Sequence, residues 1–212
     1  MKLLVSAGPT REHLDPVRFI SNASSGRMGY AIARAAAARG HQVTLVTGPV
    51  EIEPPRGVKV IAVRTSAEMA SACRRVFRDC DAGMMAAAVC DYRPARSEAR
   101  KTPKSGRPIR VLLEPTEDIA ASLGRRKGRR VLVGFALEDH AGRLHAERKL
   151  RAKHFDLIVL NGPSNIGSTQ ATVEFYSPEE GWSRQVRGSK RVVARRIVRM
   201  VETRVAGRCQ AR

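Results

Sequence analysis

The sequence RFISNASSGRMG, residues 18–29, leads into the alanine-rich run YAIARAAAA, residues 30–38. Alanine is the strongest helix former, so the run predicts a helix over residues 25–39 that stops at Gly40. Serine and asparagine favour helix caps, and free N–H groups at a helix start attract anions. The start of this helix is therefore a candidate anion site. An ordinary capped N-terminus, with glycines that permit close packing on a strand, explains the same residues.

Apolar runs bounded by turn residues alternate with helical segments along the chain. Strands are predicted over residues 2–7, 41–47, 58–63, 83–89, 109–113, 130–136 and 156–161, and helices over 66–77, 116–124, 140–153 and 190–204. The run at 83–89 is apolar throughout, as expected for a strand covered on both faces. This alternation predicts an α/β fold, a doubly wound, mostly parallel Rossmann-like sheet with helices on both faces. Segments 171–177 and 182–186 predict an antiparallel hairpin near the C-terminus.

The length of 212 residues lies between one and two domains, and the pattern predicts a single domain over residues 1–205. Residues 206–212 are expected to form a frayed tail. Residues 94–108 are rich in Arg, Lys, Ser, Gly and Pro and show no periodicity, which is unusual for a loop inside a compact domain. We interpret them as a flap that carries Lys101 and Lys104 and closes over an anion, or as a surface insertion.

The composition limits the classes of function. The formal net charge is +19 and the hydrophobic content 42%, which favours anionic substrates, a polyanion or simply a solvated basic surface. Aromatic residues make up only 4% and do not interleave with the basic runs, so nucleic-acid binding is not favoured. No apolar run is long enough to span a bilayer. The four cysteines lack C-x-x-C and metal-site spacings, which indicates reduced thiols, a cytoplasmic location and no resident metal.

Several nucleotide and hydrolase motifs are missing. The chain contains no Walker A sequence and no G-x-S-x-G, and Gly8-Pro9-Thr10 follows the first strand where G-x-G-x-x-G would mark a dinucleotide site. An NAD(P)-binding oxidoreductase and a basic nucleic-acid-binding module stay open as alternatives. Polar or ring side chains remain at predicted strand ends, on the flap and on one helix face, where a ligand would bind: Thr10, Asn22, Asp91, Lys101, Phe135, Lys149 and Lys153. Spacing alone therefore predicts a site for a nucleotide or another polyanion.

Six motifs carry a resemblance to a known family: SAGPTRE at 6–12, DPVRFISN at 15–22, SSGRMG at 24–29, VTGP at 46–49, AAVCDYR at 87–93 and VGFA at 133–136. Together they resemble phosphopantothenate–cysteine ligase, which in many bacteria is the C-terminal half of a bifunctional coenzyme A biosynthesis flavoprotein. The resemblance extends from about residue 2 to residue 204. No decarboxylase half accompanies it, so FMN is not expected, and a separate decarboxylase is a candidate partner.

The resemblance implies an activity and a set of site residues. Members of this family join 4′-phosphopantothenate to L-cysteine with CTP and Mg²⁺ through an acyl-cytidylate, releasing pyrophosphate and then CMP, and they form homodimers. The preference of this chain for CTP or ATP is left open. The motifs place Asn22 and Lys101 in catalysis, and Arg18, Asn22 and Ala87 at phosphopantothenate. They place the following residues at the nucleotide: Met85, Ala86, Ala87, Asp91, Lys101, Phe135, Lys149 and Lys153.

The chain departs from the family pattern at three places. The flap reads RKTPK at 100–104 where Lys-Ile-Lys-Lys is usual, which leaves the register of its lysine open. Residues 115–118 read PTED, without the lysine that usually begins this loop, and Leu137 stands where a small residue is common. The last two changes border the expected nucleotide site and suggest an altered nucleotide preference or affinity.

Overall fold

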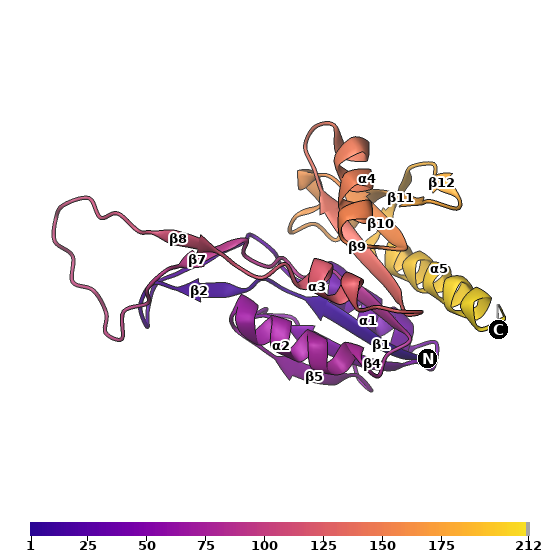
Figure 1. Cartoon of the computed structure of the whole chain (residues 1–212), viewed down its shortest axis with the longest axis horizontal. Helices are drawn as coiled ribbons and strands as arrows, with labels where there is room; N and C mark the ends of the chain where they lie inside the picture. The colour runs from indigo at the N-terminus through magenta and orange to yellow at the C-terminus, as the bar shows by residue number, and fades with distance from the viewer. Residues whose placement is uncertain (211–212) are drawn as a thin grey trace.

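The computed structural model describes residues 1–210 and has a central sheet covered by helices on both faces (Figure 1). The parallel strands lie side by side in the order β10 (Leu157–Asn161), β9 (Val131–Leu137), β6 (Ala82–Met85), β1 (Lys2–Ala7), β4 (Gln42–Thr47) and β5 (Lys59–Ala62). Numbered along the chain, this is the strand order of dinucleotide-binding sheets, which reverses between β1 and β6. The predicted fold class is confirmed.

The antiparallel part of the sheet lies beyond β10. Strand β11 (Gln170–Ser177) runs antiparallel to β10, and β12 (Gly181–Trp182) and β13 (Val186–Ser189) both pair antiparallel with β11. The predicted C-terminal hairpin is therefore present, although its second arm is divided into two short strands.

Alternate side chains of β1 show how the two layers form. Leu3 and Val5 face the helices α1 (Arg27–Ala37) and α5 (Lys190–Gln210), whereas Leu4 faces the opposite layer. That layer consists of α2 (Ser66–Phe77), α3 (Ile119–Arg125) and α4 (Gly142–Ala152). All three side chains are at most 1% exposed, because successive side chains of a strand point to opposite faces and both faces are covered.

Close contact between α1 and β1 fixes the position of the first helix. A Cβ atom added to Gly29 would lie 2.5 Å from the Cβ of Ala7, closer than real side chains approach. Gly8 follows β1 with φ of 71°, a conformation that favours glycine. The glycines of the SSGRMG motif thus let the helix start directly above the carboxyl end of β1.

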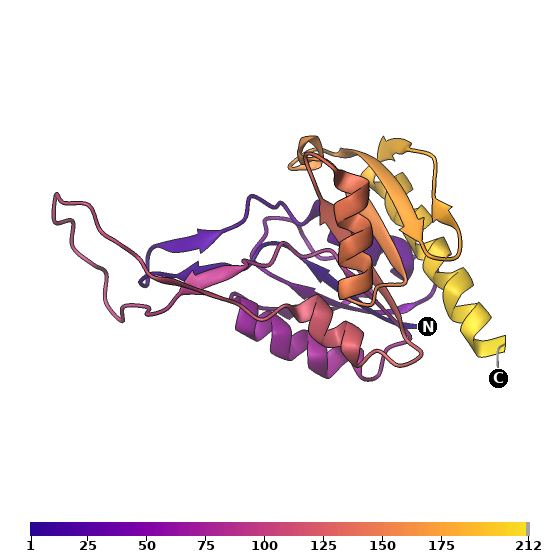
Figure 2. The same cartoon turned by 45° about the horizontal axis from the view of Figure 1, so that its top comes forward.

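Two small hairpins form an arm that extends away from the sheet (Figures 1 and 2). Strand β2 (Arg11–His13) pairs with β3 (Phe19–Ser21), and β7 (Tyr92–Pro94) pairs with β8 (Leu113–Pro115), with the loop 95–112 at the far end. The prediction of a strand over 109–113 is wrong, since only Leu113 is in β8. Residues 109–112 have no partner strand, and Ile109 and Leu112 are 65% and 78% exposed.

The starts of three helices and one strand end differ from the predictions. Helix α1 begins at Arg27, two residues later than predicted. Helix α3 begins at Ile119 and is capped by Asp118, whose Oδ1 accepts the Ala121 N–H at 2.9 Å. Thr116, the predicted cap, instead donates its hydroxyl to the Cys90 carbonyl. Helix α4 begins at residue 142, two residues later than predicted, and β6 ends at Met85 because the chain then bends over β1.

The C-terminal helix is longer than predicted. Residues 206–210, expected to fray, continue α5 to Gln210. Tertiary contacts explain the difference, because the Arg208 guanidinium donates to the carbonyls of Arg129 and Arg130 at 3.0 and 2.7 Å and to the Asp156 carboxylate. Residues 211–212 of the predicted tail lie outside the described residues.

All four cysteines are free thiols. Burial raises the pKa of Cys73 to about 12 and that of Cys80 to about 11, and it also raises the pKa of Cys90. Within residues 1–210, no helix combines the length and the apolar character needed to cross a membrane.

We predict that Gly29→Ala lowers the free energy of unfolding by about 1–3 kcal/mol, because the new methyl group overpacks the α1–β1 contact. Urea denaturation measures the change. Gly207→Ala is the matched control, since Gly207 is helical with no atom within 4 Å of an added Cβ, and should raise stability by about 0.5–1 kcal/mol. Equal stability of Gly29→Ala and the parent would contradict the close contact.

Candidate functional site

A cavity of about 490 Å³ opens beyond the carboxyl ends of β6, β9 and β10, next to the point where the strand order reverses. A smaller cavity of about 180 Å³ adjoins it. The two share a wall whose residues are Ala87, Val89, Asp91, Phe135 and Lys149. Ligands of doubly wound sheets bind at this position, so the paired cavities form the candidate site.

The start of α1 forms one end of the larger cavity. Residues 22–28 line it, and the N-cap is Gly26 with φ of 71°, without a side-chain hydrogen bond to the helix. The alternative of an ordinary side-chain cap is therefore wrong: Ser24 Oγ accepts from the Gly26 N–H, outside the helix, and Ser21 donates to the Thr10 carbonyl. No side chain caps the N–H groups of the first turn, so the positive end of the helix is open to a ligand.

The segment after β6 forms the floor of the cavity. The N–H groups of Ala86 and Ala88 donate to backbone carbonyls of Ser6 and Gly8, at 3.2 and 2.9 Å, so the chain crosses the end of β1. Asn22 donates its side-chain amide to the carbonyls of Ala88 and Val89, at 3.3 and 3.0 Å. These bonds fix the Asn22 amide against the cavity wall. Thr10 is buried and accepts the Cys90 N–H, so it supports this segment without lining the cavity.

Lysines and carboxylates meet at the smaller cavity. Burial lowers the pKa of Lys149, and the positive charge of the nearby Lys153 lowers it further, to a smaller extent. Lys153 Nζ pairs with Asp118 at 2.9 Å. Burial acts to raise the pKa of Asp118, but the Ala121 N–H and the Lys153 ammonium outweigh it, so that pKa lies below its usual value. The charge of Lys153 is thus partly balanced, whereas Lys149 reaches both cavities.

The larger cavity carries a net positive charge. Its wall holds three cations, Arg27, Lys149 and Lys190, and one carboxylate, Asp91. No group of three or more His, Cys, Asp or Glu side chains within residues 1–210 is placed to hold a metal ion. The chemistry of the wall therefore suits an anionic ligand.

The structure brings most of the predicted site residues together. Asn22, Ala86, Ala87, Asp91, Phe135 and Lys149 line the larger cavity, and Met85 and Lys153 line the smaller one. Leu137, the position that departs from the family pattern, lines the larger cavity, and Thr116, Glu117 and Asp118 line the smaller one. Their roles toward a ligand stay predictions.

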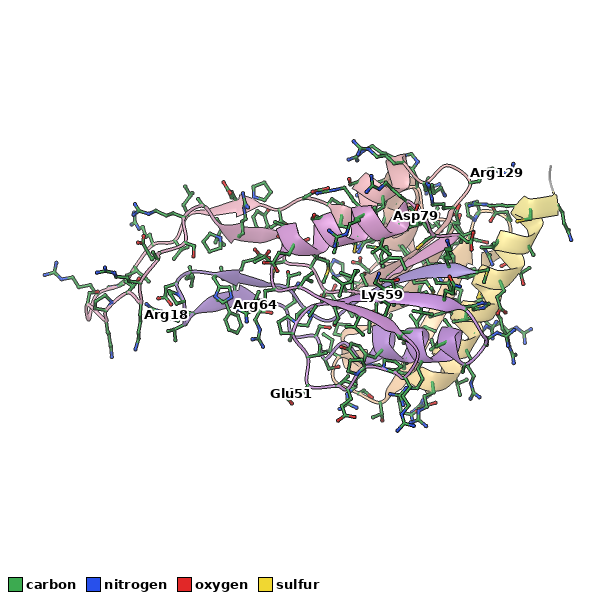
Figure 3. The ribbon with its side chains drawn as sticks, turned by 90° about the horizontal axis from the view of Figure 1, so that it is seen from below. Arg18, Glu51, Lys59, Arg64, Asp79 and Arg129 are labelled. Atoms are coloured by element: carbon green, nitrogen blue, oxygen red, sulfur yellow. The ribbon has the colours of Figure 1, made fainter. Side chains whose placement is uncertain are left out.

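Arg18 and Lys101 do not line either cavity of the chain. Arg18 lies on the arm beside the 95–112 loop (Figure 3) and pairs with the buried Asp15, with Nε to Oδ2 at 2.9 Å. This hydrogen bond from Arg18 holds the pKa of the Asp15 carboxyl well below its usual range. Arg18 also donates to the Thr102 carbonyl at 2.7 Å, which ties the loop that carries Lys101 to the tip of the first hairpin.

Sequence reasoning missed Asn161, Asn165 and Lys190, which all line the larger cavity. Asn161 ends β10, and its Oδ1 is buried without a hydrogen-bond partner among residues 1–210. The rule that ligands bind at strand ends could have identified it. Lys190 begins a strongly basic helix, and no local signal distinguishes it from the arginines that follow.

Comparison with known proteins gives the family. The model of the DNA/pantothenate metabolism flavoprotein C-terminal domain matches residues 1–205, and the chain belongs to this family. The resemblance seen in the sequence is confirmed. A Mycobacterium bovis protein named coenzyme A biosynthesis bifunctional protein CoaBC is 40% identical over 227 aligned positions, covering 97% of this chain and 53% of that protein.

A further relative, from an unknown prokaryotic organism, is named cysteine/cysteine sulfinic acid decarboxylase and is 48% identical over 169 residues, which cover 79% of this chain and 47% of that protein. The chain spans about half the length of the curated relatives it matches. A crystal structure of the C-terminal domain of CoaBC is 35% identical with a TM-score of 0.83, covering 97% of this chain and 96% of that one. A Cab2 mutant in complex with phosphopantothenate-cysteine shares the fold at 17% identity, with a TM-score of 0.81 over 99% of this chain and 88% of its own.

We predict that Asn161→Leu changes the free energy of unfolding by less than about 1 kcal/mol, because no group within residues 1–210 satisfies its oxygen. Asn165→Leu is the control. Its side chain bonds both backbone groups of Thr172, at 2.9 and 3.1 Å, and its loss should cost about 2–4 kcal/mol. Urea denaturation compares the two variants. An equal loss in both would mean that Asn161 serves the fold and is not kept for a ligand.

Proposed function

We propose that this chain joins 4′-phosphopantothenate to L-cysteine with CTP, as a carbon–nitrogen ligase of coenzyme A biosynthesis acting in the cytoplasm. The observation that carries the proposal is the convergence of Asn22, Asp91 and Lys149 on one cavity, in a chain of this family. The names of its bifunctional relatives and its likeness to the C-terminal domain of CoaBC support the same activity.

The reaction has two steps, neither of which needs a nucleophile from the protein. In the first, a carboxylate oxygen of phosphopantothenate bonds to the α-phosphorus of CTP, and pyrophosphate leaves with the electron pair of the broken P–O bond. In the second, the cysteine amine attacks the acyl carbon, loses a proton, and releases CMP. Holding the reactants in line and balancing their charge accounts for most of such catalysis. A cavity with three cations and one carboxylate is suited to that task.

The wall shared by the two cavities is the proposed nucleoside site. Phe135 covers a ring face there, Asp91 accepts from a base or sugar, and Met85, Ala86 and Ala87 leave room for the nucleotide. Lys149 and Lys153 add positive charge, and Asn22 holds the acyl intermediate. Mg²⁺ bound to the phosphates would supply further charge neutralisation. The phosphates and water would hold this ion, since Asp91 is assigned to the base or sugar.

Pairing of two copies through the arm completes the proposal. The arm exposes Val17, Phe19, Tyr92, Ile109 and Leu112, each at least 40% accessible. Apolar side chains gathered on one projection indicate a protein interface. Arg18 and Lys101 lie on this arm, outside the cavities of their own chain, so a homodimer would supply them to the partner's cavity. Arg18 would then bind phosphopantothenate and Lys101 the nucleotide.

The ligase activity is tested by release of pyrophosphate with phosphopantothenate and either CTP or ATP, with and without L-cysteine. We expect release with CTP and Mg²⁺, and formation of the amide only when cysteine is added.

Asn22→Asp should accumulate the acyl-cytidylate and slow amide formation by about 10²-fold, because the held intermediate loses its amide partner. Gln170→Glu makes the same chemical change at an exposed position and serves as the control. Absence of release with both nucleotides would refute the ligase, and full turnover by Asn22→Asp would remove Asn22 from the mechanism.

If the partner subunit supplies Arg18 to the site, two inactive variants should restore each other's activity when mixed. Arg18→Ala and Asn22→Ala should each be inactive alone, yet a mixture that exchanges subunits should recover about a quarter of the parent activity, since half of the dimers would contain one intact site. Light scattering at micromolar concentration should report a dimer. A monomer, or a mixture without activity, would contradict the shared site.

A further inference from the structure

Lys190 is a buried cation whose side chain is fixed at the cavity wall. It is the first residue of α5 and is 9% exposed. Its ammonium donates to the Asn165 carbonyl at 2.8 Å, and its backbone N–H donates to the Thr169 carbonyl at 2.9 Å. The Asn165 side chain is itself held by both backbone groups of Thr172. The ammonium therefore has a defined place, with one of its three N–H groups used.

No carboxylate balances the charge of Lys190. Within residues 1–210, its ammonium has no carboxylate oxygen within 4 Å, although a buried charge is costly unless it is paired. Arg27 lines the same cavity as a second cation, and burial, followed by the charge of Arg27, lowers the pKa of Lys190. A neutral donor would hold the Asn165 carbonyl without this cost. An anion in the cavity would balance this charge.

The groups around Lys190 define where that anion lies. The wall near Arg27 is the start of α1, whose first-turn N–H groups have no side-chain cap. Three carboxylates, Asp91, Glu117 and Asp118, line the smaller cavity, and Asp91 also lines the larger one, on the wall that the two cavities share. One end of the paired cavities thus carries cations and uncapped N–H groups, and the other end carries both cations and carboxylates. The first end suits phosphates, and the second suits a nucleoside.

We propose that Lys190, with Arg27 and the first turn of α1, binds the β- and γ-phosphates of the nucleotide and stabilises pyrophosphate as it leaves. This inference rests on the proposed ligase function. When the phosphopantothenate carboxylate bonds to the α-phosphorus, the bond from that phosphorus to the bridging oxygen breaks, and its electron pair departs on pyrophosphate. Negative charge therefore grows next to the fixed ammonium, which makes Lys190 a catalytic residue that contacts the leaving group.

The test compares Lys190→Met with Lys190→Arg and with the control Lys59→Met. Lys59 begins β5 (Figure 3) at an exposed position and lines neither cavity, so its substitution removes the same charge elsewhere. We expect Lys190→Met to slow pyrophosphate release by about 10²- to 10³-fold and to weaken inhibition by pyrophosphate at least about tenfold. Inhibition by CMP should change less than about twofold, and Lys190→Arg should retain part of the activity.

The CMP measurement separates a lost phosphate contact from a damaged fold. Equal weakening of pyrophosphate and CMP inhibition, or unchanged inhibition by both, would overturn the role of Lys190. If the parent chain shows no ligase turnover, calorimetric titration with pyrophosphate still decides the inference. Tighter binding by the parent and by Lys59→Met than by Lys190→Met supports it, and equal binding by all three overturns it. Failure of turnover alone refutes only the ligase assignment.

Discussion

The contact between Gly29 and Ala7 sets the geometry of the site. Because no side chain separates α1 from β1 at this point, the helix starts directly above the end of the strand. The segment after β6 then hydrogen-bonds across the same strand end, through Ala86 and Ala88. The positive end of the helix and the floor of the cavity are thus positioned by the same strand. A bulkier residue at 29 would move the helix and its N–H groups together.

The cations of the site are positioned by helices, and no single sequence motif contains them all. The starts of α1 and α5 bring Arg27 and Lys190 to one end, while α4 and the start of α3 bring Lys149, Lys153 and Asp118 to the other. These elements lie far apart in the sequence and meet only because the sheet has its particular strand order. A molecule with a charged tail and a polar ring therefore has one favoured orientation in the paired cavities.

Local sequence patterns predict the parallel sheet well, because each strand is a buried apolar run ended by turn residues. These patterns do not predict strands that pair over only a few residues, or helix ends that depend on contacts far away in the sequence. Strands β2, β3, β7 and β8 contain three residues each, and several of their side chains face solvent, so no alternation identifies them. The end of α5 depends on the contacts of Arg208 with a loop and with Asp156. In the candidate site, Asp91 and Phe135 follow from the rule of strand ends and Lys149 and Lys153 from their spacing on one helix face, whereas Met85, Ala86 and Ala87 were expected only from the family resemblance. Lys190 depends on a loop that only the fold brings near.

The burial of the thiols has a consequence for the proposed ligase, which would take free cysteine as a substrate. Thiolates, not thiols, exchange with disulfides, and burial raises the pKa of Cys73, Cys80 and Cys90, which lowers the thiolate fraction of each. Oxidised cysteine therefore finds little to react with near the sheet. Cys209, exposed on the last turn of α5, is open to such exchange, and a mixed disulfide there would sit on a helix end that does not line the cavities. The fold therefore protects most of the chain's own thiols from exchange with an oxidised amino acid thiol.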